Sequence, residues 1–276
     1  MANKKSSSSK NSMSFLDHLE ELRWHLIRAT IAIFVVTILA FVFKDIVFDV
    51  IIFGPKDPQF ISYRALCWLS GKFGGDMFCF SEMPFELMNT KMAGQFMMHL
   101  WVSFVAGLIV AFPYIFYEMW RFVKPGLHSK ERSHSKGIIF ITSFLFTLGV
   151  SFGYFVIAPF SVQFLATYSV SVDVINRIDL SSYISTITSV TLASGVVFEL
   201  PIVVYFLSRV GILTPEIMRT YRKHSIVVIL VLAAIITPPD ITSQVLVTLP
   251  VLLLYEISIK ISGRVEKNRK KKMAAL

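Results

Sequence analysis

The stretch MAGQFMMHLWVSFVAGLIVAFPYIFY, residues 92–117, contains no charged side chain. A helix needs about 20 consecutive apolar residues to cross the hydrocarbon core of a bilayer, because each residue adds about 1.5 Å along the axis. The stretch exceeds this length and therefore predicts a transmembrane helix. We expect an integral membrane protein.

Five further apolar runs lie on either side of this stretch. They span residues 29–43, extended upstream by residues 24–27, and then 137 to about 159, about 183–207, 225–236 and 242–255. The third and fourth runs of the chain are long enough to cross a bilayer. The fifth and sixth are short and are separated only by residues 237–240. By length alone they could form two spans, one broken span or a re-entrant hairpin.

The composition agrees with a membrane protein and argues against the soluble classes. The chain is 54% hydrophobic and only 16% charged, whereas globular domains contain about 25% charged residues. The net charge of +9 is not accompanied by a basic and aromatic module, so we expect no binding to nucleic acid. Residues 1–14 are polar and serine-rich, which predicts a disordered cytoplasmic tail and not a cleaved signal peptide.

The distribution of positive charge predicts the topology. Most of the 27 lysines and arginines fall on one side if the chain crosses the membrane six times and begins inside. Because cytoplasmic segments are rich in Lys and Arg, both termini are expected in the cytoplasm. This gives an all-α protein with six transmembrane helices, a core over residues 15–262, a long periplasmic loop over 44–91, and a basic cytoplasmic tail over 263–276. Residues 81–86 in that loop predict a helix start that leads into the second span.

Four short motifs occur in order along these runs. They are FLDHLEELR at residues 15–23, WRFVKPGLHSKER at 120–132, SGVVFELP at 194–201 and TPPDITSQ at 237–244. Together they resemble the signatures of the C subunit of the twin-arginine (Tat) protein translocase, the TatC family. The resemblance covers about residues 14–262. It departs from the family at Trp24 and His25, where basic residues are common.

The resemblance implies a receptor for twin-arginine signal peptides and a transport role without catalytic residues or a cofactor. Its expected binding residues are Leu19, Glu21, Arg23, Phe122, Leu127 and Glu131. Guanidinium groups pair best with carboxylates, so Glu21 and Glu131 would recognise the two signal arginines. From the residues alone, Glu131 could equally be neutralised by its basic neighbours.

The resemblance also implies a setting and partners. The setting would be the inner membrane, with energy from the proton motive force. The partners would be single-span A- and B-type subunits, cargo signal peptides, membrane lipids and other copies of the chain. We expect a concave, cup-like bundle whose fifth and sixth spans are short.

Glu199 lies inside the fourth apolar run, about 15 Å along a helix from Arg209. A charge at such a depth is costly, which leaves two interpretations open. Glu199 could be a protonated acid that is hydrogen-bonded between helices, or a polar point on a concave face that receives a partner helix. A proton-coupled secondary transporter is the alternative function, but it would predict matched halves that the sequence lacks.

Cys67 and Cys79 are the two cysteines of the chain, and both fall in the predicted periplasmic loop. Because that compartment is oxidising, we predict a disulfide between them. The six histidines are scattered and no C-x-x-C motif occurs, so no metal site is expected. Pro238, Pro239 and Asp240 are expected to form a structural turn between the fifth and sixth spans.

Overall fold

The computed structural model describes residues 15–72, 85–123, 135–171, 173, 176–237 and 240–273, and these are mostly helical. The longer helices are α1 (Phe15–Val42), α2 (Ile61–Lys72), α3 (Gly94–Val123), α5 (Ser135–Phe152), α6 (Ala158–Thr167), α7 (Leu180–Val197), α8 (Leu200–Val210), α10 (Arg222–Ile236) and α11 (Ile241–Met273). The shorter segments are η1 (Ile46–Ile52), η2 (Gly54–Lys56), η4 (Gly153–Ile157) and α9 (Pro215–Thr220).

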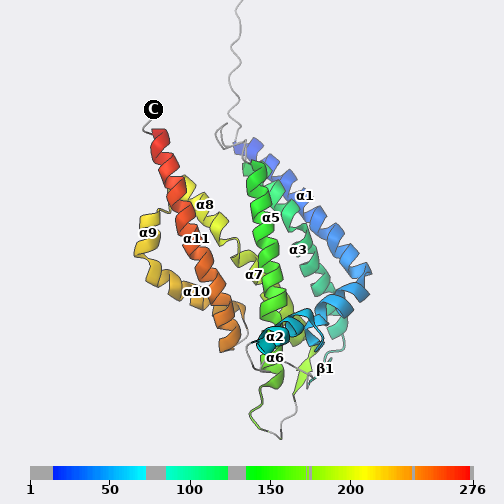
Figure 1. Cartoon of the computed structure of the whole chain (residues 1–276). Coiled ribbons are helices and arrows are strands. Elements are labelled where there is room, and N and C mark those ends of the chain that lie inside the picture. The colour runs from blue at the N-terminus through cyan, green and yellow to red at the C-terminus, as the bar shows by residue number, and fades with distance from the viewer. Residues whose placement is uncertain are drawn as a thin grey trace, which may run out of the picture.

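The helices form a bundle with α5 and α7 in its middle. On one side α1 packs along α3, and on the other α8 and α10 pack against α11 (Figure 1). The described start of α1 and the end of α11 lie at the same end of the bundle, together with the end of α3 and the start of α5. We call this the terminal end. The strands, α2 and α6 lie at the opposite end.

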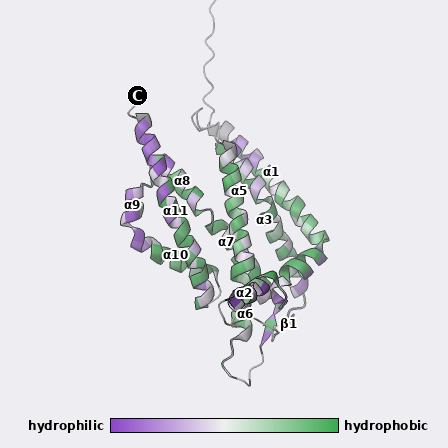
Figure 2. Cartoon of the chain, viewed as in Figure 1, coloured by the Kyte–Doolittle hydropathy of each residue, from purple (hydrophilic) through white to green (hydrophobic). Residues whose placement is uncertain are grey.

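Five helical segments are long and apolar enough to cross a membrane. They are Leu19–Val42, Gly94–Val123, Gly137–Thr167, Leu180–Val210 and Ile241–Lys271. Their middle parts are apolar, whereas α9 and the last turns of α11 are hydrophilic (Figure 2). The chain is therefore a multi-pass membrane protein. The predicted fifth run corresponds to α10, which has 15 residues and would reach only about 22 Å. The count of six spans stays a prediction.

The sixth run differs from its prediction. The helix that carries it, α11, has 33 residues and continues to Met273. The prediction of a short sixth helix was therefore wrong for the helix, although its apolar part is short. Lys, Arg and Glu are good helix formers, so the helix extends into the basic region that we assigned to the tail. Residues 263–273 are helical and continue α11.

A small parallel sheet departs from a purely helical fold. Strand β1 (Glu86–Met88) pairs with β2 (Arg177–Asp179), with Leu87 opposite Ile178. The predicted helix start was wrong at Glu86, which begins β1; residues 81–84 lie outside the described part. Two strands of three residues leave no periodic signal in the sequence, so their pairing is set by the helices that they connect.

The fourth predicted span is interrupted. Helix α7 ends at Val197 and α8 begins at Leu200, so Phe198 and Glu199 form a turn between them. Pro201 occupies the first turn of α8, where the missing N–H group of proline costs no helical hydrogen bond. Glu199 therefore lies at a turn within the segment Leu180–Val210, which is long and apolar enough to cross a membrane and contains the span predicted over residues 183–207.

Candidate functional site

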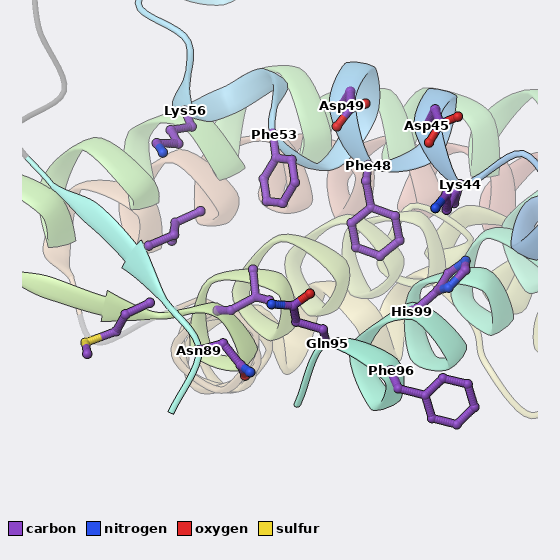
Figure 3. Close-up of a pocket in the computed structure, with 13 residues that line it drawn as sticks. Lys44, Asp45, Phe48, Asp49, Phe53, Lys56, Asn89, Gln95, Phe96 and His99 are labelled. Atoms are coloured by element: carbon purple, nitrogen blue, oxygen red, sulfur yellow. The ribbon is translucent and has the colours of Figure 1, made fainter. Parts of the chain in front are cut away.

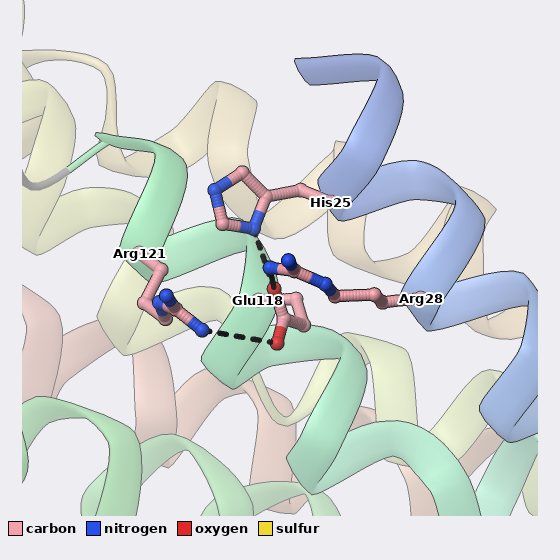
Figure 4. Close-up of polar contacts among 4 residues, drawn as sticks. All are labelled: His25, Arg28, Glu118 and Arg121. Atoms are coloured by element: carbon pink, nitrogen blue, oxygen red, sulfur yellow. Dashed lines mark hydrogen bonds and ion pairs between the residues drawn. The ribbon is translucent and has the colours of Figure 1, made fainter. Parts of the chain in front are cut away.

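A buried cluster of charged side chains joins α1 to α3 at the terminal end. Glu118 of α3 is only 2% exposed. Its carboxylate lies 2.5 Å from Nδ1 of His25, 3.7 Å from Nη1 of Arg121 and 3.9 Å from Nη1 of Arg28 (Figure 4). His25 is also buried, whereas the two arginines are about half exposed at the rim.

The electrostatics of this cluster follow from its burial. An isolated carboxylate in the apolar part of a bundle would be strongly destabilising. Cationic or hydrogen-bonding partners surround Glu118 and compensate for its lost hydration: His25, Arg28, Arg121 and the hydroxyl group of Tyr114. Removal of any one partner would leave buried charge that is not fully compensated. The cluster therefore holds α1 against α3.

The structure places the predicted binding residues of α1 and α3 around this cluster. Glu21 and His25 are four residues apart and thus share a face of α1, as Glu118 and Phe122 do on α3. The ring of His25 contacts the ring of Phe122 edge to face, with centroids 6.3 Å apart. Oε2 of Glu21 is buried and makes no hydrogen bond to any described residue.

The other predicted binding residues are exposed on α1 or follow α3 in the sequence. Leu19 is 45% exposed and Arg23 is also exposed, so both side chains are accessible on the first turns of α1. Leu127 and Glu131 lie outside the described residues. Glu21 on α1 and Phe122 on α3 thus each lie one helical turn from the contact of His25 with Glu118.

Glu199 lies away from this cluster, at the break between α7 and α8. Both of its carboxylate oxygens are buried, and neither makes a well-formed hydrogen bond to a described residue. The nearby helix α5 approaches closely because it carries Gly149, where an added Cβ would meet the Ser194 carbonyl oxygen and the Phe198 side chain. Among the described residues, Glu199 is therefore an acid without an ion-pair partner in the middle of the bundle, close to the backbone of Phe146.

The predicted turn before α11 is described only in part. Pro238 and Pro239 lie outside the described residues, whereas Asp240 is buried and precedes Ile241, the first residue of α11. Its Oδ1 accepts a hydrogen bond of 2.5 Å from the backbone N–H of Ser243, which is the geometry of a helix N-cap. A hydroxyl pair, Ser161 with Ser243 at 2.8 Å, links this turn of α11 to α6.

A cleft of about 720 Å³ opens at the end of the bundle opposite to the termini (Figure 3). Phe48 and Phe53 of the η1 region face Gln95 and His99 of α3 across it. None of the residues predicted from the sequence lines this cleft. Within the described residues, no group of three or more His, Cys, Asp and Glu side chains could hold a metal ion.

Cys67 lies on α2, near this end of the bundle. The described part of the chain contains no free cysteine. Cys79 falls outside that part, so the disulfide between Cys67 and Cys79 stays a prediction.

The family described as Sec-independent protein translocase protein (TatC) matches residues 17–250 of the chain. The chain belongs to the TatC family. The TatC protein of Blattabacterium sp. subsp. Periplaneta americana is 42% identical over 262 residues, which cover 94% of this chain and 98% of that protein. The TatC protein of Aquifex aeolicus is 34% identical over 270 residues, which cover 95% and 99% of the two chains.

Solved structures agree with this assignment. A crystal structure of the twin-arginine translocase receptor TatC, determined in DDM, superposes with a TM-score of 0.70 at 33% identity and covers 89% of this chain and 99% of that one. A second crystal structure of the receptor gives a TM-score of 0.67 at 32% identity. The family prediction from the four motifs is therefore confirmed, and the chain is a membrane component of protein transport.

The TatC motifs did not reveal the cluster around Glu118. His25 and Glu118 are 93 residues apart, and only the packing of α1 on α3 brings them together. Two signals were present in the sequence. Glu118 is an acid at the end of a long apolar run, and His25 follows Glu21 by one helical turn at a position where the TatC resemblance departs.

Proposed function

We propose that the chain is the receptor subunit that binds twin-arginine signal peptides at its cytoplasmic face. The observation that carries this proposal is the surface where Glu21 of α1 and Phe122 of α3 both adjoin His25. Glu21 offers a buried carboxylate oxygen without a hydrogen-bond partner among the described residues, and Phe122 adds an aromatic ring. A signal peptide presents guanidinium groups followed by an apolar segment, and these two side chains suit both features.

The same proposal includes Glu131 as a second carboxylate. A single carboxylate can pair with one guanidinium group, so recognition of two arginines favours two acids at one interface. Glu131 follows Phe122 by nine residues in the sequence. Leu19, Arg23 and Leu127 would then contact the peptide around the two arginines.

The topology that this proposal requires has six spans with both termini in the cytoplasm of an inner membrane. Two observations support it. The described ends of the chain lie at one end of the bundle (Figure 1). That end carries the hydrophilic last turns of α11 (Figure 2), which contain basic residues. Positive charge is retained on the cytoplasmic side.

We further propose that the chain organises single-span A- and B-type subunits in the inner membrane, alongside membrane lipids and other copies of itself. Glu199 is the proposed contact for a partner helix. An unpaired acid in an apolar bundle stabilises a neighbour that brings a hydrogen-bonding side chain. The proton motive force would supply the energy for transport.

The test is a binding measurement on the purified protein in detergent or nanodiscs. A fluorescent peptide with a twin-arginine signal is expected to bind, and the same peptide with two lysines is expected to bind at least tenfold more weakly, because an ammonium group cannot form a bidentate pair. Equal affinity for the two peptides would contradict the proposed recognition.

A further inference from the structure

Helix α1 packs mainly against one other helix of the bundle. Only 6% of the apolar window of its span is buried, and its principal packing partner is α3. The two helices pack along one another, and three specific contacts between them lie at different levels. The middle level is at Gly107, where an added Cβ would meet the backbone of Ile33 and Thr37, so the two helices approach closely.

The level farthest from the termini is formed by His99. Its Nε2 donates a hydrogen bond of 3.1 Å to the carbonyl oxygen of Phe41, and its ring stacks on the Phe41 ring with centroids 3.9 Å apart. This contact holds the last turns of α1. It lies more than four helical turns from Glu21, so it cannot fix the position of that side chain.

The level nearest to the termini is the pair of His25 and Glu118. Their contact of 2.5 Å is buried on both sides, and it is supported by Arg28 and Arg121. Among the described side chains of residues 19–25 in α1, no other hydrogen bond or ion pair reaches another helix. The charged groups that face the pair are Arg28 on α1 and Arg121 on α3 (Figure 4).

We propose that His25 and Glu118 are positioning residues of the signal-binding surface. Their contact holds the first turns of α1, with Leu19, Glu21 and Arg23, against the end of α3 that carries Phe122. His25 contacts two successive turns of α3, because it bonds to Glu118 and packs on Phe122, which is one helical turn further along. This inference rests on the proposed function, since it assigns a role toward the peptide.

The consequence for binding is a population effect. Without the His25–Glu118 contact, the first turns of α1 would leave α3 for part of the time. Apparent affinity falls in proportion to the fraction of molecules in the competent arrangement. If that fraction falls to about one tenth, the peptide Kd rises about tenfold, although neither positioning residue need touch the peptide.

The experiment compares four variants with the parent protein. Glu118→Leu and His25→Leu each remove the contact, and the double variant His25→Glu/Glu118→His restores a histidine–carboxylate pair with its members exchanged. His99→Leu is the matched control, because it loosens α1 at the opposite end. Two quantities are measured: the Kd of the twin-arginine peptide, and the hydrogen exchange of backbone amides in residues 19–24 without peptide.

Each single variant is expected to raise the Kd about tenfold and to speed exchange in residues 19–24, with exchange in residues 100–117 unchanged. The exchanged pair is expected to recover most of the affinity, and His99→Leu is expected to leave the Kd near that of the parent. If Glu118→Leu does not fold, Glu118→Gln replaces it: the amide oxygen can still accept from His25, so its Kd is expected to rise less than that of His25→Leu.

The outcomes separate this inference from the proposed function. Failure of the parent to prefer twin arginine over twin lysine contradicts the proposed function, while the exchange rates still report on positioning. A parent that discriminates, together with single variants whose Kd and exchange rates equal those of the parent, overturns the positioning role. Faster exchange throughout α3 in the single variants also overturns it, because the contact would then be a general support of the fold.

Discussion

Asp179 accepts a hydrogen bond of 2.6 Å from the hydroxyl group of Thr90, although the two residues lie 89 positions apart in the sequence. Asp179 is also the N-cap of α7, where it accepts from the backbone N–H of Ser181 at 2.9 Å. One carboxylate thus joins the end of β2 and the start of α7 to the segment that precedes α3. These hydrogen bonds, chiefly from the Ser181 hydroxyl and then from Thr90, hold the pKa of Asp179 well below its ordinary value.

We predict that Asp179→Ala lowers the Tm, by about 2–4 °C, because it removes a cap and the link to Thr90. A depressed pKa in the folded state means that the carboxylate stabilises the fold above its ordinary pKa of about 3.9 and loses this effect as the pH falls below that value. Thermal unfolding in detergent at pH 7 and pH 3.5 measures both effects.

The control for this prediction is Asp179→Asn. An asparagine can still cap α7 but carries no charge, so its Tm at pH 7 should lie between those of Asp179→Ala and the parent. The difference in Tm between the two proteins should then shrink at pH 3.5. A constant difference across this pH range would show that ionisation of Asp179 does not contribute to stability.

A glycine pair on α5 and η4 yields a second prediction. Gly149 and Gly153 lie one helical turn apart against Ser194 of α7, and a Cβ at either position would lie too close to it. The obstacle at Gly149 includes a backbone oxygen, which cannot move aside as a flexible side chain can. Gly149→Ala is expected to destabilise the protein by about 1–3 kcal/mol, because α5 and α7 must separate.

The matched control is Gly137→Ala, on the same helix. A Cβ at Gly137 would meet no atom within 4 Å, so alanine should be neutral or stabilising by about 0.5–1 kcal/mol through its helix propensity. The two substitutions are therefore expected to change the stability in opposite directions in a denaturant or thermal unfolding series. Equal effects would mean that α5 and α7 do not pack as described.

The sequence predicted the long helices because the apolar runs exceed the thickness of a bilayer, and it predicted the family from four ordered motifs. Contacts between segments that are distant in the sequence could not be predicted. His25 and Glu118 meet only after α1 has packed on α3, and β1 pairs with β2 without a periodic signal, although the paired residues lie 91 positions apart. The break at Glu199 could have been predicted from Pro201, since proline is tolerated in the first turn of a helix and disrupts its interior.

The predicted disulfide can be tested directly. Cys67 and Cys79 should resist alkylation by a thiol reagent in denatured, non-reduced protein, and both should react after reduction. A bridge that closes this loop of 11 intervening residues would stabilise it by about 3 kcal/mol in the chain-entropy model. Mass spectrometry that finds both thiols alkylated without reduction would contradict the prediction. Cys67→Ser should then have no more effect on stability than Ser70→Ala on the same helix.

Glu199 is expected to tolerate loss of its charge better than loss of its polarity. Glu199→Gln keeps hydrogen-bonding groups for a partner helix and should retain much of the transport, whereas Glu199→Ala should lose more. Export of a reporter with a twin-arginine signal, in cells that depend on the variant, measures this. Near-normal export by both variants would indicate a purely structural residue. Failure of Glu199→Gln with an active Glu199→Asp would indicate proton exchange, as the transporter alternative requires.

Recognition of the signal arginines is expected to depend on Glu21 and Glu131. Glu21→Ala and Glu131→Ala should each remove a charge-assisted pair, on the order of 1.5–3 kcal/mol, and raise the Kd of the twin-arginine peptide about ten- to hundredfold. Glu→Lys at either position should bind more weakly still, because it adds repulsion. Salt should weaken binding to the parent, although less than for a fully exposed pair, since Oε2 of Glu21 is buried.

The control for this series is Glu216, an exposed acid in the first turn of α9 that lies outside the four motifs. Glu216→Ala changes the net charge by the same amount as Glu21→Ala, so it reports the effect of overall electrostatics alone. Its Kd should stay within about twofold of the parent, because an exposed charge that makes no direct contact contributes little. If Glu21→Ala and Glu131→Ala bind as tightly as Glu216→Ala and still reject the twin-lysine peptide, the arginines must be recognised at another surface.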